Sequence, residues 1–308
     1  MRVIITGGSG MIGRALAGSL LRDGHDVIVL SRNPAARSGV LAGAQIQHWD
    51  ARTADGWGHL AEGADAIVNL AGERVAGPNP FAYRWTEARK RRICESRRRA
   101  GEAVTQAVER AAHKPGVVVQ ISGTNYYPPT GKIATENTPP GDDFLARVCK
   151  DCWELPTAPV ERMGVRRVIV RTGPVLDAHE GALPPMLLQT RLFVGGRIGS
   201  GRQWFPWVHR ADVAAGIRFL IDTPEARGAF NLCAPNPLTN AQFAQTLARV
   251  LGRPAFVRVP AWAMRLLFGE MAVTLLQGPR AMPARLQEIG FAFRFPEAEA
   301  ALRDLLGR

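Results

Sequence analysis

The chain has 308 residues, of which 46% are hydrophobic and 21% charged, and its formal net charge is +12 at pH 7. This length allows one large domain or two modest ones, and the composition is ordinary for a globular protein. No apolar stretch reaches the roughly 18 residues of a membrane span, and the chain starts on a strand pattern without the features of a signal peptide. The sequence therefore excludes a membrane-spanning protein and predicts a cytoplasmic one without a membrane partner.

The four cysteines are Cys94, Cys149, Cys152 and Cys233. They are too few and too scattered for a disulfide framework in a chain of this length. Cys149 and Cys152 form a C-x-x-C pair, which could serve redox chemistry or half a zinc site. No second pair of this kind and no paired histidines exist to complete four ligands. We interpret the two as small residues on a helix and predict no metal site.

The densest positive charge is the run RKRRICESRRR at residues 89–99. Such a run could meet the phosphates of a nucleic acid. However, Ile93, Ala100, Val104 and Ala107 recur at the spacing of an amphipathic helix, and no aromatic residues are interleaved to stack on bases. The run therefore predicts a surface helix and no nucleic-acid partner.

The first 32 residues predict a strand, a glycine turn, a helix and a second strand. Arg2 to Thr6 is a short β-branched run that fits a strand buried on both faces of a parallel sheet. Apolar residues from Ile12 to Leu21 follow the glycines at helical spacing, and Val27 to Leu30 completes the βαβ unit.

The glycines of this turn have separate roles in a dinucleotide-binding motif. Gly7 makes the tight turn, Gly10 lets the backbone approach a pyrophosphate, and Gly13 lets the helix lie close to the strand. The free N–H groups of the helix N-terminus then face the anionic ligand. Because strand, turn and helix stand in the required order, we predict cofactor contacts at Gly7, Gly10, Met11, Ile12 and Gly13.

The end of the second strand indicates which nicotinamide cofactor is bound. A free ribose 2′-hydroxyl is usually held by a carboxylate about 20 residues past the glycines, but this chain has Ser31 and Arg32 there, followed by Arg37. A guanidinium suits a 2′-phosphate, which a carboxylate would repel. We therefore predict NADP(H) over NAD(H), the alternative being that Arg32 is a solvated loop charge.

Further strands are predicted at residues 45–49, 66–70, 117–121 and 167–171. Leu70, Ala71 and Gly72 stand where backbone would pass under the cofactor, unless they are a plain strand end. The third of these strands ends near Ser122, Tyr126 and Tyr127, whose hydroxyls could polarise a carbonyl or relay a proton. Lys150 lies on the helix predicted at residues 144–154. These four residues are the candidate catalytic groups.

Composition shifts after Val175. A glycine-rich basic loop at residues 195–202 precedes Trp204, and Arg197 and Arg202 could hold an anionic substrate with the tryptophan as a wall. The segment could equally be a structural hairpin packed by aromatic rings. His209 is a further candidate at this site, and Asp212 is a candidate N-cap for the helix that follows.

We predict a doubly wound parallel sheet of the α/β class, with a smaller mixed α/β lobe at the C-terminal end. Residues 1–175 would form the nucleotide-binding Rossmann domain and residues 176–308 the substrate-binding lobe. Helices are expected at residues 240–251, 260–276 and 282–290. The sequence carries no signal for the oligomeric state.

The pieces together resemble the extended short-chain dehydrogenases/reductases of the NAD-dependent epimerase/dehydratase type, within the atypical branch called epimerase family proteins. The markers are TGGSGMIG at 6–13, NLAGE at 69–73, PPGDDF at 139–144, GSGRQWFPWVH at 199–209 and NPLTNAQFA at 236–244. The last of these begins a C-terminal module of unknown function at about 236–300.

The resemblance implies an extended Rossmann fold and NADP(H). It also implies cofactor contacts at the glycine turn and at Ser31, Arg32, Leu70, Ala71, Arg97 and Val175.

The chain departs from its relatives at the usual Tyr-x-x-x-Lys pair, in which the lysine lowers the tyrosine pKa. Ala146 stands four residues before Lys150. One function is therefore an NADP(H)-dependent oxidoreductase or epimerase-like enzyme on a small-molecule substrate, with Tyr126 or Tyr127 replacing the missing phenol. The other is an NADP(H)-binding protein with little or no catalysis, which serves a protein partner as a structural part or redox signal.

Overall fold

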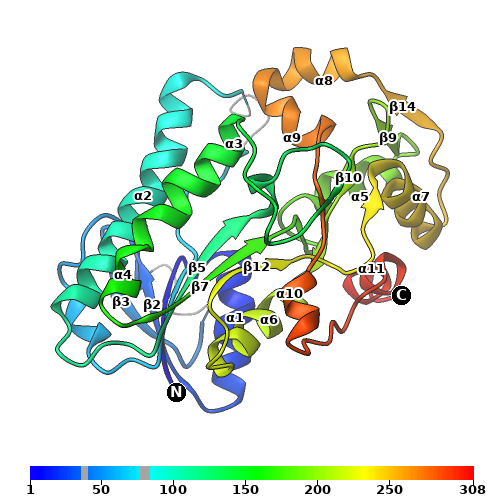
Figure 1. Ribbon diagram of the computed structural model, residues 1–308. Coiled ribbons are helices and arrows are strands. Elements are labelled where there is room, and N and C mark those ends of the chain that lie inside the picture. The colour runs from blue at the N-terminus through cyan, green and yellow to red at the C-terminus, as the bar shows by residue number, and fades with distance from the viewer. Residues whose placement is uncertain (36–40, 77–83) are drawn as a thin grey trace.

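The structure is a computed structural model that describes residues 1–35, 41–76 and 84–308. Its centre is a seven-stranded parallel sheet with the strand order β12-β7-β5-β4-β1-β2-β3 (Figure 1). The strands are β1 (Arg2–Thr6), β2 (Asp26–Ser31), β3 (Gln45–His48), β4 (Ala66–Asn69), β5 (Val117–Gly123), β7 (Arg166–Thr172) and β12 (Gly228–Leu232). This arrangement confirms the predicted doubly wound α/β class.

The side chains along each strand point alternately to the two faces of the sheet. Both faces are apolar, and helices cover both. Val3 and Ile5 of β1 join one hydrophobic cluster with α1 (Met11–Arg22) and α6 (Arg210–Asp222). Ile4 joins another cluster with α2 (Glu87–Arg110). The second face also carries the nearly continuous helical segment α3 (Phe144–Arg147), η4 (Val148–Glu154, π-helical), η5 (Leu155–Thr157) and α4 (Pro159–Arg162).

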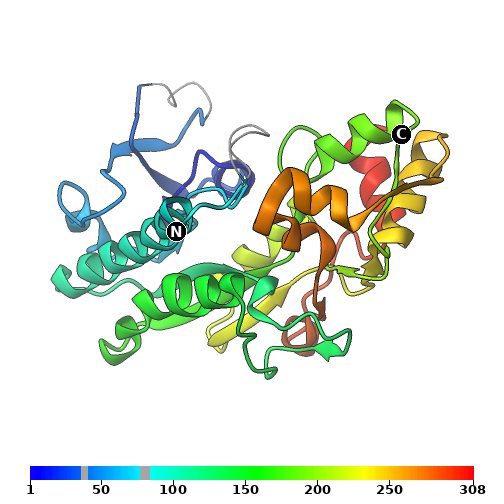
Figure 2. The same cartoon turned by 90° about the horizontal axis from the view of Figure 1, so that it is seen from above.

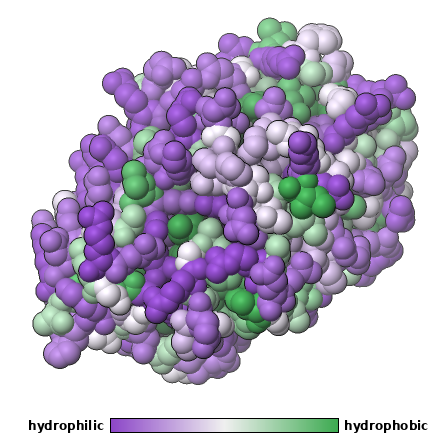
Figure 3. Space-filling model, viewed as in Figure 1, coloured by the Kyte–Doolittle hydropathy of each residue, from purple (hydrophilic) through white to green (hydrophobic). Residues whose placement is uncertain are grey.

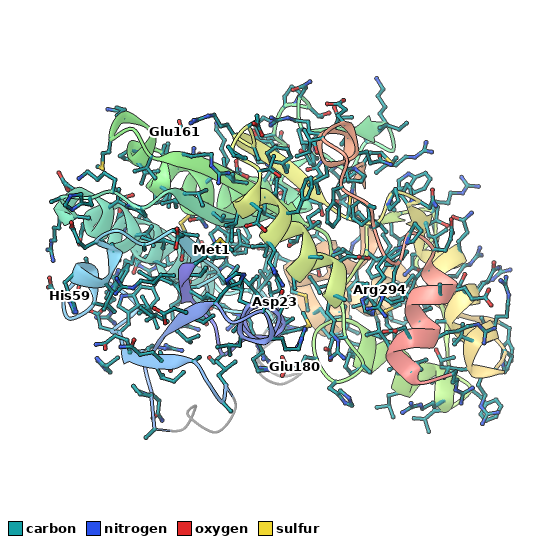
Figure 4. All side chains as sticks on the ribbon, turned by 90° about the horizontal axis from the view of Figure 1, so that it is seen from below. Met1, Asp23, His59, Glu161, Glu180 and Arg294 are labelled. Carbon is teal, nitrogen blue, oxygen red and sulfur yellow. A yellow bond between two sulfur atoms is a disulfide. The ribbon has the colours of Figure 1, made fainter. Side chains whose placement is uncertain are left out.

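Two ion pairs connect α1 and the residue that follows it, Asp23, to later parts of the chain. Arg14 pairs with Glu180 at 2.7 Å, and Arg218 of α6 pairs with Asp23 at 2.6 Å. Figure 4 labels both acidic side chains on this side of the molecule. Because both pairs are partly exposed, we attribute most of the stability of this layer to its buried apolar side chains.

The C-terminal lobe has its own hydrophobic core, which contains Leu187, Phe243 and Leu302. Figure 2 shows the lobe beside the half of the molecule that holds the first strands of the seven-stranded sheet. Its helices are α5 (Leu183–Arg191), α7 (Asn240–Leu251), α8 (Ala261–Phe268), α9 (Val273–Leu276), α10 (Ala284–Glu288) and α11 (Ala298–Leu306), with η6 (Gly269–Ala272) between α8 and α9. Its short strand pairs are β9 (Gly196–Ile198) with β14 (Val257–Val259), and β10 (Trp204–Phe205) with β13 (Leu238–Thr239).

Two further short pairs join the halves of the chain. β8 (Val175–Leu176) pairs with β11 (Val208–His209), and β6 (Ile133–Ala134) pairs with β15 (Arg280–Ala281). The central sheet also takes α6 and β12 from beyond residue 175. The chain therefore returns to the sheet after entering the C-terminal lobe.

Helix α7 has the bounds predicted from the sequence, and Thr239 and Gln242 form a reciprocal capping box at its start. The helix expected at 260–276 is instead three short segments, because the chain turns at Gly269, where φ is +58°. Among the described residues, no helix is long and apolar enough to cross a bilayer.

The cysteine prediction needs one correction. Cys152 is more than a small helix residue, because it forms a disulfide with Cys94 that joins η4 to α2. Cys149 and Cys233 are free and buried. The disulfide links residues 58 apart in sequence, and only the packing of α2 on η4 brings them together.

Candidate cofactor and substrate site

The glycine turn lies against the carboxyl end of β4. Gly7 has φ +65°, and a Cβ there would come 3.0 Å from the carbonyl of Leu70. A Cβ on Gly13 would come 2.4 Å from the Cα of Gly8. Both positions require glycine, because a side chain would collide with backbone rather than with a flexible side chain. Met11 and Ile12 are half-buried at the start of α1.

A chain of buried polar side chains fixes the edge of the sheet beside this turn. Thr6 donates its hydroxyl proton to Asn69 at 2.6 Å and accepts from the backbone N–H groups of Leu70 and Ala71. Asn69 in turn donates to Gln120 at 2.8 Å. The ends of β1, β4 and β5 are therefore held together next to the glycine turn.

Arg97 of α2 supplies a buried positive charge at the same edge. Its side chain is 3% exposed, its guanidinium stacks on Trp153 at 4.1 Å, and a Cβ on Gly72 would lie 3.2 Å from it. Burial lowers the pKa of Arg97 to about 10. Its Nε has no hydrogen-bond partner among the described residues. A buried, incompletely paired guanidinium fits an anionic cofactor and would be costly without one.

Ser31 and Arg32 lie at the carboxyl end of β2. The Ser31 hydroxyl is buried and accepts a hydrogen bond from the backbone N–H of Asn33. The Arg32 side chain is exposed and forms no ion pair within the part of the chain that the structure describes. The third basic residue of the prediction, Arg37, lies outside the described residues. Val175 is buried on β8.

The candidate catalytic hydroxyls differ in their accessibility. Ser122 is buried at the end of β5 and donates to Glu154 at 2.8 Å. Tyr127 is 1% exposed, donates to Asn231 at 2.7 Å and accepts from Arg171 at 3.0 Å. Burial raises the pKa of Tyr127 to about 12. Tyr127 is therefore part of a sealed polar cluster.

Sequence reasoning missed the centre of that cluster, the ion pair of Arg171 and Glu154. Arg171 Nε and Nη2 meet the two carboxylate oxygens at 2.9 and 2.8 Å, and both side chains are less than one-tenth exposed. Glu154 accepts a hydrogen bond from Ser122, and Arg171 donates one to Tyr127. Its bidentate geometry connects the ends of β5 and β7 to helix η4. A buried strand ending in arginine was the only signal in the sequence.

Tyr126 is the half-buried phenol of the pair. Its ring lies under the Arg171 guanidinium, 3.4 Å from the centroid. Burial raises the pKa of Tyr126, and the charge of Arg171 opposes this shift. The hydroxyl therefore stays protonated at neutral pH and can act as an acid.

Lys150 is exposed on η4 and is not brought together with Ser122 or the tyrosines. The preceding residue, Cys149, is buried there instead, with its Sγ 3.6 Å from where a Cβ on Gly123 would lie. Burial raises the pKa of the Cys149 thiol to about 12. The neutral thiol does not supply the positive charge of the usual lysine.

A basic residue that sequence reasoning did not select lies against the predicted Trp204. Arg280 of β15 stacks on Trp204 at 4.4 Å, and its Nε is buried without a partner among the described residues. The Nε of Arg197 on β9 is likewise buried without a partner among the described residues. Arg202 is exposed. A small hollow is lined by residues of η3 (Thr124–Tyr126), α3 and α9 and by their neighbours, including Asn125, Asp143, Thr274 and Pro279, but not by Arg280.

The prediction of His209 as a substrate-site residue is wrong on structural grounds. Its side chain is 1% exposed and caps α6, with Nδ1 accepting from the backbone N–H of Ala211. The expected cap, Asp212, lies within the helix and accepts from the backbone of Arg294 and Phe295 instead. The sequence spacing is compatible with either cap, and the position of residues 294–295 decides between them.

His209 should make the protein less stable as the pH falls. Burial lowers its pKa to about 4, with Asp304 opposing this shift and Arg210 and Arg294 adding to it. Because the unfolded chain takes up a proton near pH 6.5 and the folded chain does not, stability is lost as the pH falls from about 6.5 towards 4. We expect a loss of about 2 kcal/mol in the free energy of unfolding between pH 7 and 5. His209→Asn, which keeps a capping side chain, should flatten this slope in urea titrations; an unchanged slope would contradict the assignment.

Comparison with known proteins gives the same architecture. A family model described as the NAD dependent epimerase/dehydratase family matches residues 3–233. The chain belongs to this family. Residues 259–305 match a second model, a domain of unknown function (DUF1731). This chain has Ala146 four residues before Lys150, in place of a tyrosine, and its Lys150 is exposed.

Individual relatives cover the whole chain. Epimerase family protein SDR39U1 of Homo sapiens is 37% identical over 309 residues, covering 99% of this chain and all of the relative. Epimerase family protein YfhF of Bacillus subtilis is 36% identical over 317 residues, covering 99% of this chain and 98% of the relative. A crystal structure of human SDR39U1 with NADPH has a TM-score of 0.88 at 35% identity and full coverage of both chains.

Proposed function

We propose that the protein binds NADP(H) and is an oxidoreductase or epimerase-like enzyme on a small anionic substrate. The observation that carries the cofactor assignment is the carboxyl end of β2, where Ser31 and an exposed Arg32 replace the carboxylate that would repel a 2′-phosphate. The NADPH in the related human structure supports the same assignment. The residues that would hold the cofactor are those of the glycine turn, Ser31, Arg32, Leu70 to Gly72, Arg97 and Val175.

The substrate assignment rests on Arg280 and Arg197. Both have a buried Nε without a partner among the described residues, and Arg280 is stacked on Trp204. A buried guanidinium that lacks a partner is stabilised when it binds a carboxylate or a phosphate. We propose that these two residues and Trp204 hold the anionic end of the substrate, with Arg202 at the exposed rim.

A bound nicotinamide would exchange a hydride with the substrate, so that reduction of a carbonyl also needs one proton. We assign that proton to the Tyr126 hydroxyl, because a phenol is protonated at neutral pH and the half-buried ring of Tyr126 is the more accessible of the two. Arg171 acts on Tyr126 by placing its charge against the ring. Ser122 is a positioning residue that contacts Glu154.

Tyr126→Phe should reduce turnover by about 10²–10⁴-fold while leaving NADPH binding unchanged, since general acid catalysis contributes roughly that much. The measurement is NADPH oxidation in the presence of a panel of anionic aldehydes and ketones. Tyr127→Phe is the matched control for the loss of a hydroxyl; it removes a buried hydrogen bond and should lower stability more than turnover. Full activity of Tyr126→Phe would exclude the assigned proton donor.

A second function is favoured by one observation, the exposure of Lys150 together with Ala146 in place of the family tyrosine. On this alternative the protein binds NADP(H) without turnover and serves a protein partner. Tight NADPH binding with no oxidation by any compound of the panel would favour it over the enzyme.

A further inference from the structure

Bulky apolar side chains are exposed in two segments of the C-terminal lobe, residues 188–194 and 256–267. β14 pairs in parallel with β9, so that Val257 lies opposite Gly196 and the residues before both strands are neighbours. Figure 1 places α8, β14 and β9 together at one end of the molecule, and Figure 3 shows green, hydrophobic atoms at the top over α8. We call this surface the apolar–basic face and define it by Phe193, Phe256, Arg258, Trp262, Arg265 and Leu266.

Helix α8 presents its larger apolar residues outward. Met264 is its buried residue, whereas Trp262 is 67% and Leu266 63% exposed. Trp262, Arg265 and Leu266 are three or four residues apart and therefore share one side of the helix. Phe256, which is 72% exposed, directly precedes β14, and Arg258 lies exposed on that strand two residues later.

Phe193 is held at an unusual backbone position. It has φ +62° and follows the end of α5, a place where glycine is the common residue. Its ring is exposed and meets the Arg253 guanidinium at 4.7 Å. A bulky aromatic residue therefore occupies a strained position without being needed for the core, as expected of a surface that makes contacts.

The chain segments around this face are rich in arginine and poor in acidic residues. Residues 181–211 and residues 226–269 contain no aspartate or glutamate, while they contain nine arginines: Arg191, Arg197, Arg202, Arg210, Arg227, Arg249, Arg253, Arg258 and Arg265. The basic run on α2, by contrast, is paired with Glu73, Glu87, Glu95 and Glu102. Of the nine, Arg210 and Arg249 pair with Asp177 and Glu299. Arg253, Arg258 and Arg265 form no ion pair among the described residues, so positive charge remains beside the exposed rings.

We propose that the apolar–basic face binds the surface of an anionic phospholipid bilayer. Tryptophan and phenylalanine side chains insert at the interface between headgroups and acyl chains, and arginines beside them attract anionic headgroups. The face combines both features, and none of its six defining residues is acidic. Glu270, just beyond α8, pairs with Lys90. The protein lies on the membrane in this proposal and does not span it. The inference does not depend on the proposed enzymatic function.

The test is sedimentation of the full chain with vesicles of phosphatidylcholine alone or of phosphatidylcholine with phosphatidylglycerol. Binding to the anionic vesicles only is expected, and added salt should weaken it. Arg258→Gln with Arg265→Gln should lower the partition coefficient about fivefold per arginine. Arg91→Gln with Arg162→Gln removes the same net charge from exposed positions on α2 and α4 and is the matched control, expected to bind nearly as the wild type does.

Trp262→Ser with Leu266→Ser tests the apolar part, with Leu155→Ser, at an equally exposed leucine, as its control. Unchanged melting temperatures would establish that the variants fold. No binding to anionic vesicles would overturn the proposal, as would equal losses in the face variants and their controls. A dimer in solution that Trp262→Ser with Leu266→Ser dissociates, without vesicle binding, would show that a second copy covers this face instead.

Discussion

Replacing Arg171 with methionine is expected to lower the free energy of unfolding by about 3–5 kcal/mol, because it leaves the Glu154 carboxylate buried without its partner. Both side chains are less than one-tenth exposed, and the guanidinium forms two bonds to Glu154 and one to Tyr127. Desolvation lowers the pKa of Arg171, but its bonds to Glu154 outweigh this and raise it overall. Urea unfolding at neutral pH measures the loss.

Two control variants separate the buried charge from general effects. Arg99→Met removes an arginine from the exposed pair with Glu95 and should cost no more than about 1 kcal/mol. Glu154→Leu combined with Arg171→Met removes both buried charges and should recover part of the stability lost in Arg171→Met. A loss below about 1 kcal/mol in Arg171→Met would show that the pair does not organise this edge of the sheet.

Arg32→Asp is expected to weaken NADPH binding by about 10- to 100-fold and NADH binding much less. A charge-assisted hydrogen bond contributes roughly 1.5–3 kcal/mol, and the new carboxylate would add repulsion towards a 2′-phosphate. NADH has a hydroxyl in that place, so the carboxylate could even accept a hydrogen bond from it. Titration of both nucleotides, followed by nucleotide fluorescence, measures the ratio.

Arg22→Asp is the control for the change in net charge. Arg22 ends α1, whereas the glycine turn precedes the start of that helix, and its side chain is exposed. It should leave both affinities nearly unchanged. Equal losses of NADPH and NADH binding in Arg32→Asp would mean that Arg32 is a solvated loop charge.

The nucleotide-binding half could be predicted from the sequence because its signals are local. Val3 to Ile5 form a strand buried on both faces, the glycines turn the chain, and the apolar residues of α1 repeat at helical spacing. Helix α7 was predictable for the same reason, since its capping residues and its apolar face lie within one short segment.

The parts that could not be predicted depend on residues far apart in the chain. The Cys94–Cys152 disulfide, the Arg171–Glu154 pair and the contact of Arg280 with Trp204 each join residues that are distant in the chain and meet only in the folded structure. His209 takes the capping role expected of Asp212, because the Asp212 carboxylate accepts from the backbone N–H groups of Arg294 and Phe295 instead. Lys150 is exposed on the π-helical segment η4, and the spacing of residues in the sequence does not indicate this exposure.

The central claim is that the glycine turn and the end of β2 form a site for NADP(H). The most direct test is to titrate the purified wild-type protein with NADPH and NADH in parallel and to compare the two dissociation constants. We predict saturable binding of NADPH at least about tenfold tighter than that of NADH, in line with one charge-assisted contact to the 2′-phosphate. Equal affinity for both, tighter NADH binding, or no binding of either nucleotide would contradict the account.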